Sequence, residues 1–208
     1  QSASNPKFGL WSGWSDQGPL WEGIRHCNVL IENIYNVVDM TEEEMNIWAA
    51  EAKFLKAYYH FLLFTYYGPI PIVDENLPIS ASDTEVRVKR RTVDESVAYI
   101  VETIDEALIH LPARVLSSND LGRIDQVIAK GIKSRVLTYA ASPLFNGNSE
   151  MYSGFVNEDG EHFFNQSYDQ TKWDLAREAS LDAIVTAIEN GVGMYEFTSA
   201  PPNYEDEY

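Results

Sequence analysis

The chain has 208 residues, 45% of them hydrophobic and 23% charged, and this composition excludes disorder over most of its length. Its 15 Lys and Arg stand against 32 Asp and Glu, for a net charge of −17, so nucleic-acid phosphates and anionic lipid headgroups would repel it. The single cysteine, Cys27, excludes an intrachain disulfide. No run of about 18 apolar residues is present that could cross a membrane.

The first 18 residues lack a helical period and carry Trp11 and Trp14 among Gly, Ser, Asn and Pro, which predicts a loop with aromatic side chains on it. A first helix is expected over residues 19–38. Its apolar residues recur at alternating spacings of four and three and form one stripe: Leu20, Ile24, Cys27, Ile31, Ile34 and Val38. Cys27 lies on this stripe and is expected to be a buried small hydrophobe.

Thr41 and Glu44 form a capping box that begins the second helix. Its predicted inward stripe is Trp48, Ala52, Leu55, Tyr59, Leu62 and Tyr66. From Phe54 onward this helix is apolar nearly all round, which is typical of a central, buried helix. Gly68 and the prolines after it end the helix.

The connection over residues 68–91 holds a basic run that is expected to be a solvated face paired with nearby carboxylates: Arg87, Lys89, Arg90 and Arg91. A second capping box, Thr92 with Glu95, starts the third helix. The third helix has the stripe Val93, Val97, Ile100, Ile104, Ala107 and Leu111, and a fourth over 125–141 turns inward Ile128, Ile132, Val136 and Tyr139.

Residues 143–170 are irregular, rich in Asn and Gly, and carry several aromatic residues, and so long a loop is usually functional or an insertion. The last helix is expected over 172–190, with Trp173 and Ala176 on its inner face. Apart from a possible strand at 70–73, the chain is predicted to be all-α.

The helices pair as antiparallel hairpins: the first with the second and the third with the fourth. The last helix is expected to pair with a segment beyond the long loop or beyond the end of the chain. The spacing is irregular, so we predict degenerate tetratricopeptide-like hairpins with long loop insertions. In such a scaffold the function lies on the loops.

Five segments resemble the SusD/RagB family, and they follow one another along the chain in the order that the family has. The strongest is AEAKFLKAYYHF at 50–61, followed by YGPIP at 67–71. The others are WEGIRHCNVLI at 21–31, RTVDE at 91–95 with LP at 111–112, GR at 122–123 with AKGIKSRVLTYAAS at 129–142, and WDLA at 173–176. The resemblance covers roughly residues 20–190.

This resemblance implies a non-catalytic lipoprotein on the outer face of the outer membrane. It would bind an oligosaccharide or polysaccharide and deliver it to a SusC-like TonB-dependent transporter, which it covers as a lid. The lipidated N-terminal cysteine that the family uses as an anchor is not in this chain, because Cys27 lies inside a helix. The resemblance implies that residues 1–208 correspond to the N-terminal helical region, truncated at both ends.

Other functions have less support in the sequence. No cofactor or metal is expected, because His26, His60, His110 and His162 are scattered and no catalytic motif is present. His60 lies on an aromatic helix and is expected in the core. A glycoside-processing enzyme is disfavoured for the same lack of a motif, whereas a helical-repeat peptide-binding adaptor fits the fold equally well. A secretion signal with a lipidation cysteine in the unprocessed product would exclude the adaptor.

Sugar recognition needs an aromatic face for the C–H groups of the ring and polar side chains for its hydroxyls. Trp11 and Trp14, followed by Asp16 and Gln17, supply both kinds in one loop. Asn146 and Tyr152 in the second long loop are weaker candidates. The alternative for either tryptophan is that it closes the end of the helical core.

Overall fold

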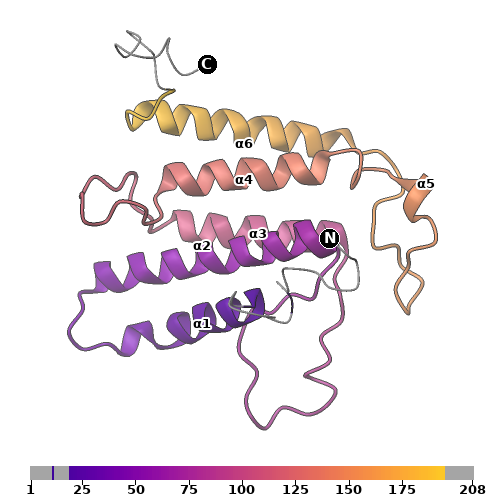
Figure 1. Ribbon diagram of the computed structural model, residues 1–208, viewed down its shortest axis with the longest axis horizontal. Helices are drawn as coiled ribbons and strands as arrows, with labels where there is room; N and C mark the ends of the chain where they lie inside the picture. Colours follow the sequence, from indigo (N-terminus) through magenta and orange to yellow (C-terminus); the bar gives the residue numbers. More distant parts are fainter. Residues whose placement is uncertain (1–10, 12–18, 195–208) are drawn as a thin grey trace, which may run out of the picture.

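The computed structural model describes residue 11 and residues 19–194 (Figure 1). Its elements are α1 (Leu20–Asn33), η1 (Ile34–Asn36), α2 (Glu42–Tyr67), α3 (Val93–Leu108), α4 (Gln126–Ala141), α5 (Ser149–Tyr152) and α6 (Gln170–Glu189). In these residues the only β-type pairs are isolated bridges, one of which joins Pro71 to Arg90. The all-α prediction is confirmed, and the possible strand at 70–73 is reduced to this single bridge.

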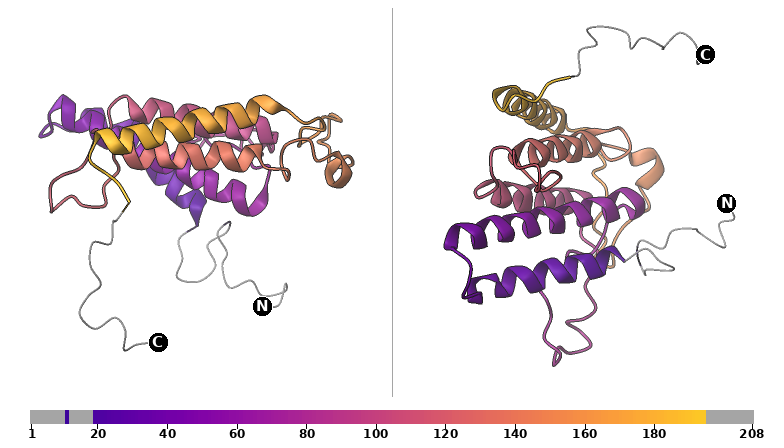
Figure 2. Two further views of the ribbon diagram at one scale, coloured as in Figure 1. Left: turned by 90° about the horizontal axis from the view of Figure 1, so that it is seen from above. Right: turned by 60° about the vertical axis from the view of Figure 1, so that its left-hand side comes forward.

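The long helices lie side by side in the order α1, α2, α3, α4, α6, each antiparallel to its neighbour (Figures 1 and 2). The two predicted hairpins, α1 with α2 and α3 with α4, are therefore present. The last helix, α6, packs along α4, which lies across the long loop from it, and its expected pairing with a segment beyond the end of the chain stays a prediction. Small and polar side chains join these two helices, with Ser134 Oγ 2.7 Å from Ser180 Oγ and Lys130 Nζ 2.9 Å from Asp182 Oδ1.

The helix ends follow from local chemistry. Both predicted capping boxes form: the Glu44 backbone N–H donates to Thr41 Oγ1 at 3.2 Å, and the Glu95 N–H donates to Thr92 Oγ1 at 3.2 Å. Gly68 ends α2 with a φ of 71°, a conformation that favours glycine. The first helix is shorter than predicted, because the chain tightens into the 3₁₀ turn η1 and leaves Val38 exposed.

The core lies between α1, α2, α3 and α4 and is built from large apolar side chains that are fully buried: Ile24, Phe61, Leu63, Phe64, Ile70, Ile100, Ile104 and Val136. Cys27 and His60 are buried as predicted. The predicted face of α2 is partly wrong, since Trp48 is 45% and Tyr66 66% exposed. Ala49, Ala50 and Ala57 are buried instead, because small residues let neighbouring helices approach closely. Ile128 on α4 and Trp173 on α6, both predicted inward, are also exposed.

The two outer helices present different surfaces. The outward side chains of α1 include Glu22, Arg25, His26 and Glu32, whereas α6 exposes Trp173, Leu181, Ile184, Val185 and Ile188. Figure 2 shows α6 as the outermost layer of the described helices. We call these five residues the outer α6 face. No helix within the described residues is long and apolar enough to span a membrane.

Candidate functional site

Several aromatic side chains contact one another around the end of α2, which lies at the right of Figure 1. The ring of Trp11 meets Trp21 of α1 and Tyr67 of α2 edge to face, with both pairs of ring centroids 5.1 Å apart. Such edge-to-face pairs stabilise an aromatic cluster beyond the area that they bury. Trp11 nevertheless keeps 38% of its surface exposed. It is thus a supported ring with an accessible side.

Behind Trp11 the support continues into the core. Trp21 packs edge-on against His60, with ring centroids 6.0 Å apart, and His60 packs likewise against Tyr99 at 5.1 Å. His60 Nε2 accepts the Val73 backbone N–H at 3.2 Å, so its Nδ1 carries the proton and donates to the Lys56 carbonyl at 2.8 Å. Burial lowers the pKa of His60 to about 4. The imidazole is therefore neutral near pH 7.

A buried cation completes this support. Lys56 Nζ donates to Asp74 Oδ1 at 2.9 Å and to the Asp74 carbonyl at 3.0 Å, and the Tyr99 hydroxyl donates to Asp74 Oδ1 at 2.8 Å. Partial burial opposes ionisation of Asp74, but the bonds from Lys56 and Tyr99 outweigh it and lower its pKa. Burial, and then the bond to Asp74, raises the pKa of Tyr99. These bonds fix the chain that leaves α2.

The long loop between α4 and α6 forms a second aromatic cluster. Tyr152 stacks on Phe164 with ring centroids 3.9 Å apart, and Phe164 stacks on Phe145, which reaches Phe64 of α2. Phe164 also lies beside Gly68, at 3.8 Å from the position of an added Cβ. Trp11 and Tyr152, which are far apart in the sequence, therefore belong to two clusters that both contact the end of α2.

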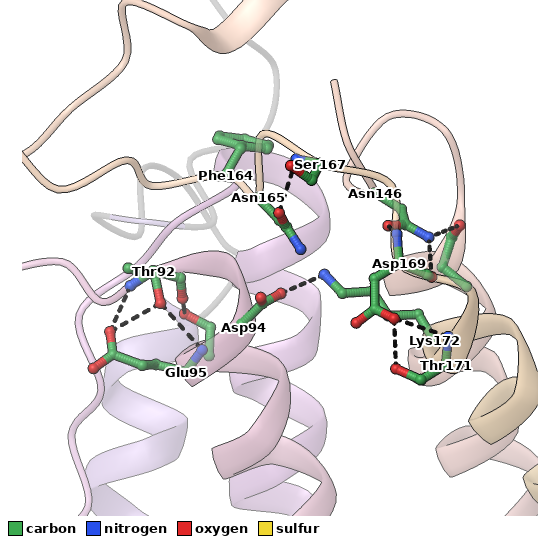
Figure 3. Close-up of polar contacts among 12 residues, drawn as sticks. Thr92, Asp94, Glu95, Asn146, Phe164, Asn165, Ser167, Asp169, Thr171 and Lys172 are labelled. Carbon is green, nitrogen blue, oxygen red and sulfur yellow. Dashed lines mark hydrogen bonds and ion pairs between the residues drawn. The ribbon is translucent and has the colours of Figure 1, made fainter. Parts of the chain in front are cut away.

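Asn146 holds this loop in place (Figure 3). Its Oδ1 accepts the Asp169 backbone N–H and its Nδ2 donates to the Asp169 carbonyl, both at 2.8 Å. The side chain is buried. These bonds occupy the amide, so the predicted contact of Asn146 with a sugar remains a prediction that this geometry does not favour.

The same region ties the loop to two helices (Figure 3). Asp169 caps α6 by accepting the Thr171 N–H at 2.9 Å, and Lys172 forms an ion pair with Asp94 in the first turn of α3. The Val93 N–H donates to the Phe163 carbonyl at 2.8 Å. The loop is therefore an ordered part of the molecule, not a loose insertion.

Of the other predicted site residues, Trp14, Asp16 and Gln17 lie outside the residues that the structure describes. Trp21 and Tyr67, the two rings that support Trp11, were not among the residues predicted for the site. Both sit next to recognisable signals, the start of the first helix and the Gly–Pro that ends the second. Neither ring lies on an apolar stripe predicted from helical periodicity. The sequence therefore contains no sign that these two rings would contact Trp11.

The structure offers little for a metal or a nucleophile. Among the described residues, no group of three or more His, Cys, Asp or Glu lies together. Burial raises the pKa of the Cys27 thiol to about 11, so this side chain stays protonated. A cavity of about 600 Å³ lined by Glu42, Asn46 and His110 lies at the start of α2. A 26-residue helix, about 39 Å long, separates it from the aromatic clusters.

Comparisons with known proteins agree with this architecture. A family model for SusD-like proteins, described as "Starch-binding associating with outer membrane", matches residues 16–137, more than half of the chain. The SusD-like protein P25 of Formosa agariphila is 25% identical over 131 residues, which are 62% of this chain and 23% of that protein.

Two solved structures are also similar. The structure named BT4246 has 34% sequence identity and a TM-score of 0.75, over 83% of this chain and 30% of that one. A laminarin-binding SusD-like protein has 26% identity and a TM-score of 0.55, over 64% of this chain and 26% of its own. The chain thus spans less than a third of the length of these relatives. Its helical fold and the matched residues show that it belongs to the SusD-like family, which the family model describes as starch-binding and associating with the outer membrane.

Proposed function

We propose that this chain is part of a non-catalytic glycan-binding lipoprotein at the cell surface, which delivers oligosaccharides to a SusC-like TonB-dependent transporter. The family description and the laminarin-binding relative support the ligand class. A lipid anchor on a cysteine that precedes this chain would hold the protein on the outer membrane. The net charge of −17 favours a neutral glycan over a polyanionic one.

The observation that carries the proposal is the position of Trp11. Pyranose rings present a face of C–H groups that packs against an indole ring. A sugar platform must be exposed on one side and held on the other, because loss of side-chain freedom on binding costs affinity. The contacts with Trp21 and Tyr67 hold Trp11 in this way while part of its surface faces solvent.

Further contacts are proposed around this platform. Trp14 would supply a second ring, and Asp16 and Gln17 would supply hydroxyl-binding groups in the same segment. Tyr152 would add a contact from the second aromatic cluster, where Phe164 already covers one face of its ring. The ligand is expected to leave chemically unchanged.

The test uses the full-length protein and a glycan chosen by array screening, with laminarin and soluble starch as the first probes. Trp11→Ala should reduce affinity about five- to a hundred-fold, which corresponds to roughly 1–3 kcal/mol. The melting temperature should change little. Trp14→Ala is measured in the same way. Trp173→Ala is the matched control, because Trp173 is also 38% exposed but lies on α6.

Two outcomes would contradict the proposal. If Trp11→Ala binds normally, or if it melts early as a core truncation of about 3–5 kcal/mol would, Trp11 closes the core and is no platform. New reducing ends released from the bound glycan by repurified protein would show an enzyme instead.

A further inference from the structure

The connection from α2 to α3 projects away from the helices at residues 74–91 (Figure 1, lower centre; Figure 2, right). It exposes four aliphatic side chains: Leu77, Ile79, Val86 and Val88. Ile79 is fully exposed. Single exposed aliphatic residues are common, but several on one projecting segment make it a candidate interaction site.

The base of this 74–91 loop is fixed to the helices. The Arg91 N–H donates to the Ile70 carbonyl at 2.9 Å, which joins the two limbs of the loop. Lys56 holds Asp74 through its carbonyl and its carboxylate, and the Asn76 N–H donates to Glu32 Oε1 at 3.2 Å. A buried lysine on α2 and a glutamate on α1 thus position the loop.

The tip has structure of its own. Glu85 Oε2 accepts from the Ser82 N–H at 2.7 Å and from the Ser82 hydroxyl at 2.6 Å, and the Val86 N–H donates to the Ser82 carbonyl at 3.2 Å. This turn holds Val86 in place on the outgoing limb. A preordered loop loses less conformational entropy when a partner binds.

The charge on the loop narrows the choice of partner. Residues 86–91 carry four of the 15 cations of the chain and no carboxylate. Lys89 pairs with Glu158 and Asp159, and Arg91 pairs with Glu95. Within the described part of the chain, Arg87 and Arg90 make no ion pair. Two cations beside aliphatic side chains fit an apolar protein surface that is bordered by carboxylates.

An anionic lipid surface fits less well. The loop also carries Asp74, Glu75, Asp83 and Glu85, so residues 74–91 have as many carboxylates as cations. Membrane recruitment by charge relies on clusters of unopposed Lys and Arg. The charge composition of the loop therefore favours a protein over a lipid surface as its binding partner.

We propose that the 74–91 loop is the surface by which this protein docks onto its transporter. The aliphatic side chains around Ile79 would enter an apolar recess on the outward face of the transporter, and Arg87 and Arg90 would meet carboxylates at its rim. This inference rests on the proposed function, which supplies the transporter as partner.

The test is capture of the transporter from mildly solubilised outer membranes by the tagged full-length protein. Ile79→Ser combined with Val86→Ser should lower the captured amount about tenfold, and Arg87→Glu should lower it further. Leu116→Ser with Leu121→Ser is the control. These leucines are as exposed but lie in the connection between α3 and α4, at the other end of the helices. Glycan affinity and melting temperature are measured on every variant and should not change.

Several results would overturn the inference. Normal capture by the loop variants would remove the docking role and leave the proposed function intact. A wild-type protein that binds glycan but captures no transporter would refute delivery itself, and docking with it. If the unlipidated protein binds anionic vesicles and the loop variants lose that binding with normal capture, the loop contacts lipid instead.

Discussion

Lys56 Nζ lies 2.9 Å from Asp74 Oδ1, yet the lysine side chain is only 8% exposed and the aspartate is 70% exposed. The ammonium group of Lys56 is therefore buried, whereas the carboxylate of Asp74 lies at the surface. The two partners should therefore contribute differently to stability, because an unpaired charge is costly only where water cannot reach it.

Asp74→Ala should lower the free energy of unfolding by about 2–3 kcal/mol, since it leaves the buried Lys56 ammonium with a carbonyl as its remaining partner. Lys56→Met should cost about 1 kcal/mol or less, because it leaves an exposed carboxylate and keeps an apolar stem in place. Urea unfolding of both variants measures the difference. Glu75→Ala, which removes the neighbouring exposed carboxylate, is the control. Equal losses from Asp74→Ala and Lys56→Met would show that burial does not decide the cost.

His60 should make stability depend on pH. Its folded pKa of about 4 lies below the ordinary value of 6.5, so the unfolded chain takes up a proton that the folded chain refuses. The contribution of the neutral His60 to the free energy of unfolding is fully present above pH 6.5 and is lost as the pH falls toward 4. We expect a loss of about 2 kcal/mol between pH 7 and pH 5 from this histidine.

Unfolding in urea at both pH values measures this loss in the wild type and in His60→Gln. The loss should shrink in His60→Gln and persist in His110→Gln, which changes an exposed histidine. Titration of the histidine ring protons by NMR gives a second readout without substitution. A His60 resonance that titrates near pH 6.5 would contradict the buried, neutral imidazole.

Gly147 should not tolerate a side chain. Its φ is 79°, and an added Cβ would lie 2.5 Å from the backbone nitrogen of Tyr168, closer than van der Waals contact allows. Gly147→Ala should therefore lower the melting temperature by several degrees or more, since backbone strain and a steric clash combine. Gly154→Ala in the same loop meets nothing within 4 Å and is the control. Similar melting temperatures for the two variants would contradict the close approach of the loop to Tyr168.

The helices could be predicted because their ends carry local signals. Thr41 with Glu44 and Thr92 with Glu95 are complete capping boxes in the sequence, and each starts a helix in the structure. The inward face of α3 was also predictable, since its apolar residues form a single stripe.

The face of α2 could not be predicted in the same way. A helix that is apolar on nearly all sides contains several stripes of equal quality, and tertiary packing chooses among them. Trp48 stays at the surface, where the Arg123 guanidinium lies 5.3 Å from its ring and also binds Glu51 with two bonds of 2.9 Å. The buried position of Lys56 depends on Asp74, which lies 18 residues away, so no local sequence pattern predicts that Lys56 is buried.

The candidate site shows the same limit. The aromatic residues in the loops were visible in the sequence, but their roles depend on long-range contacts. Trp11 meets Tyr67 across more than fifty residues, and the amide of Asn146 is filled by the backbone of Asp169. Side-chain type alone could not separate an exposed ring from an amide that holds a loop.

The outer α6 face makes the two ends of the helical stack different. The polar surface of α1 closes one side, whereas Leu181, Ile184 and Ile188 leave the other side ready for another apolar surface. Helical stacks grow by burying one neighbour against the next, and their terminal members need a polar outer face for solubility. During synthesis, α1 would fold before α6. The exposed apolar face of α6 would then associate with other apolar surfaces until another part of the protein covers it. Isolated copies of residues 1–208 should consequently associate through α6, and charged substitutions at Ile184 and Ile188 should keep them apart.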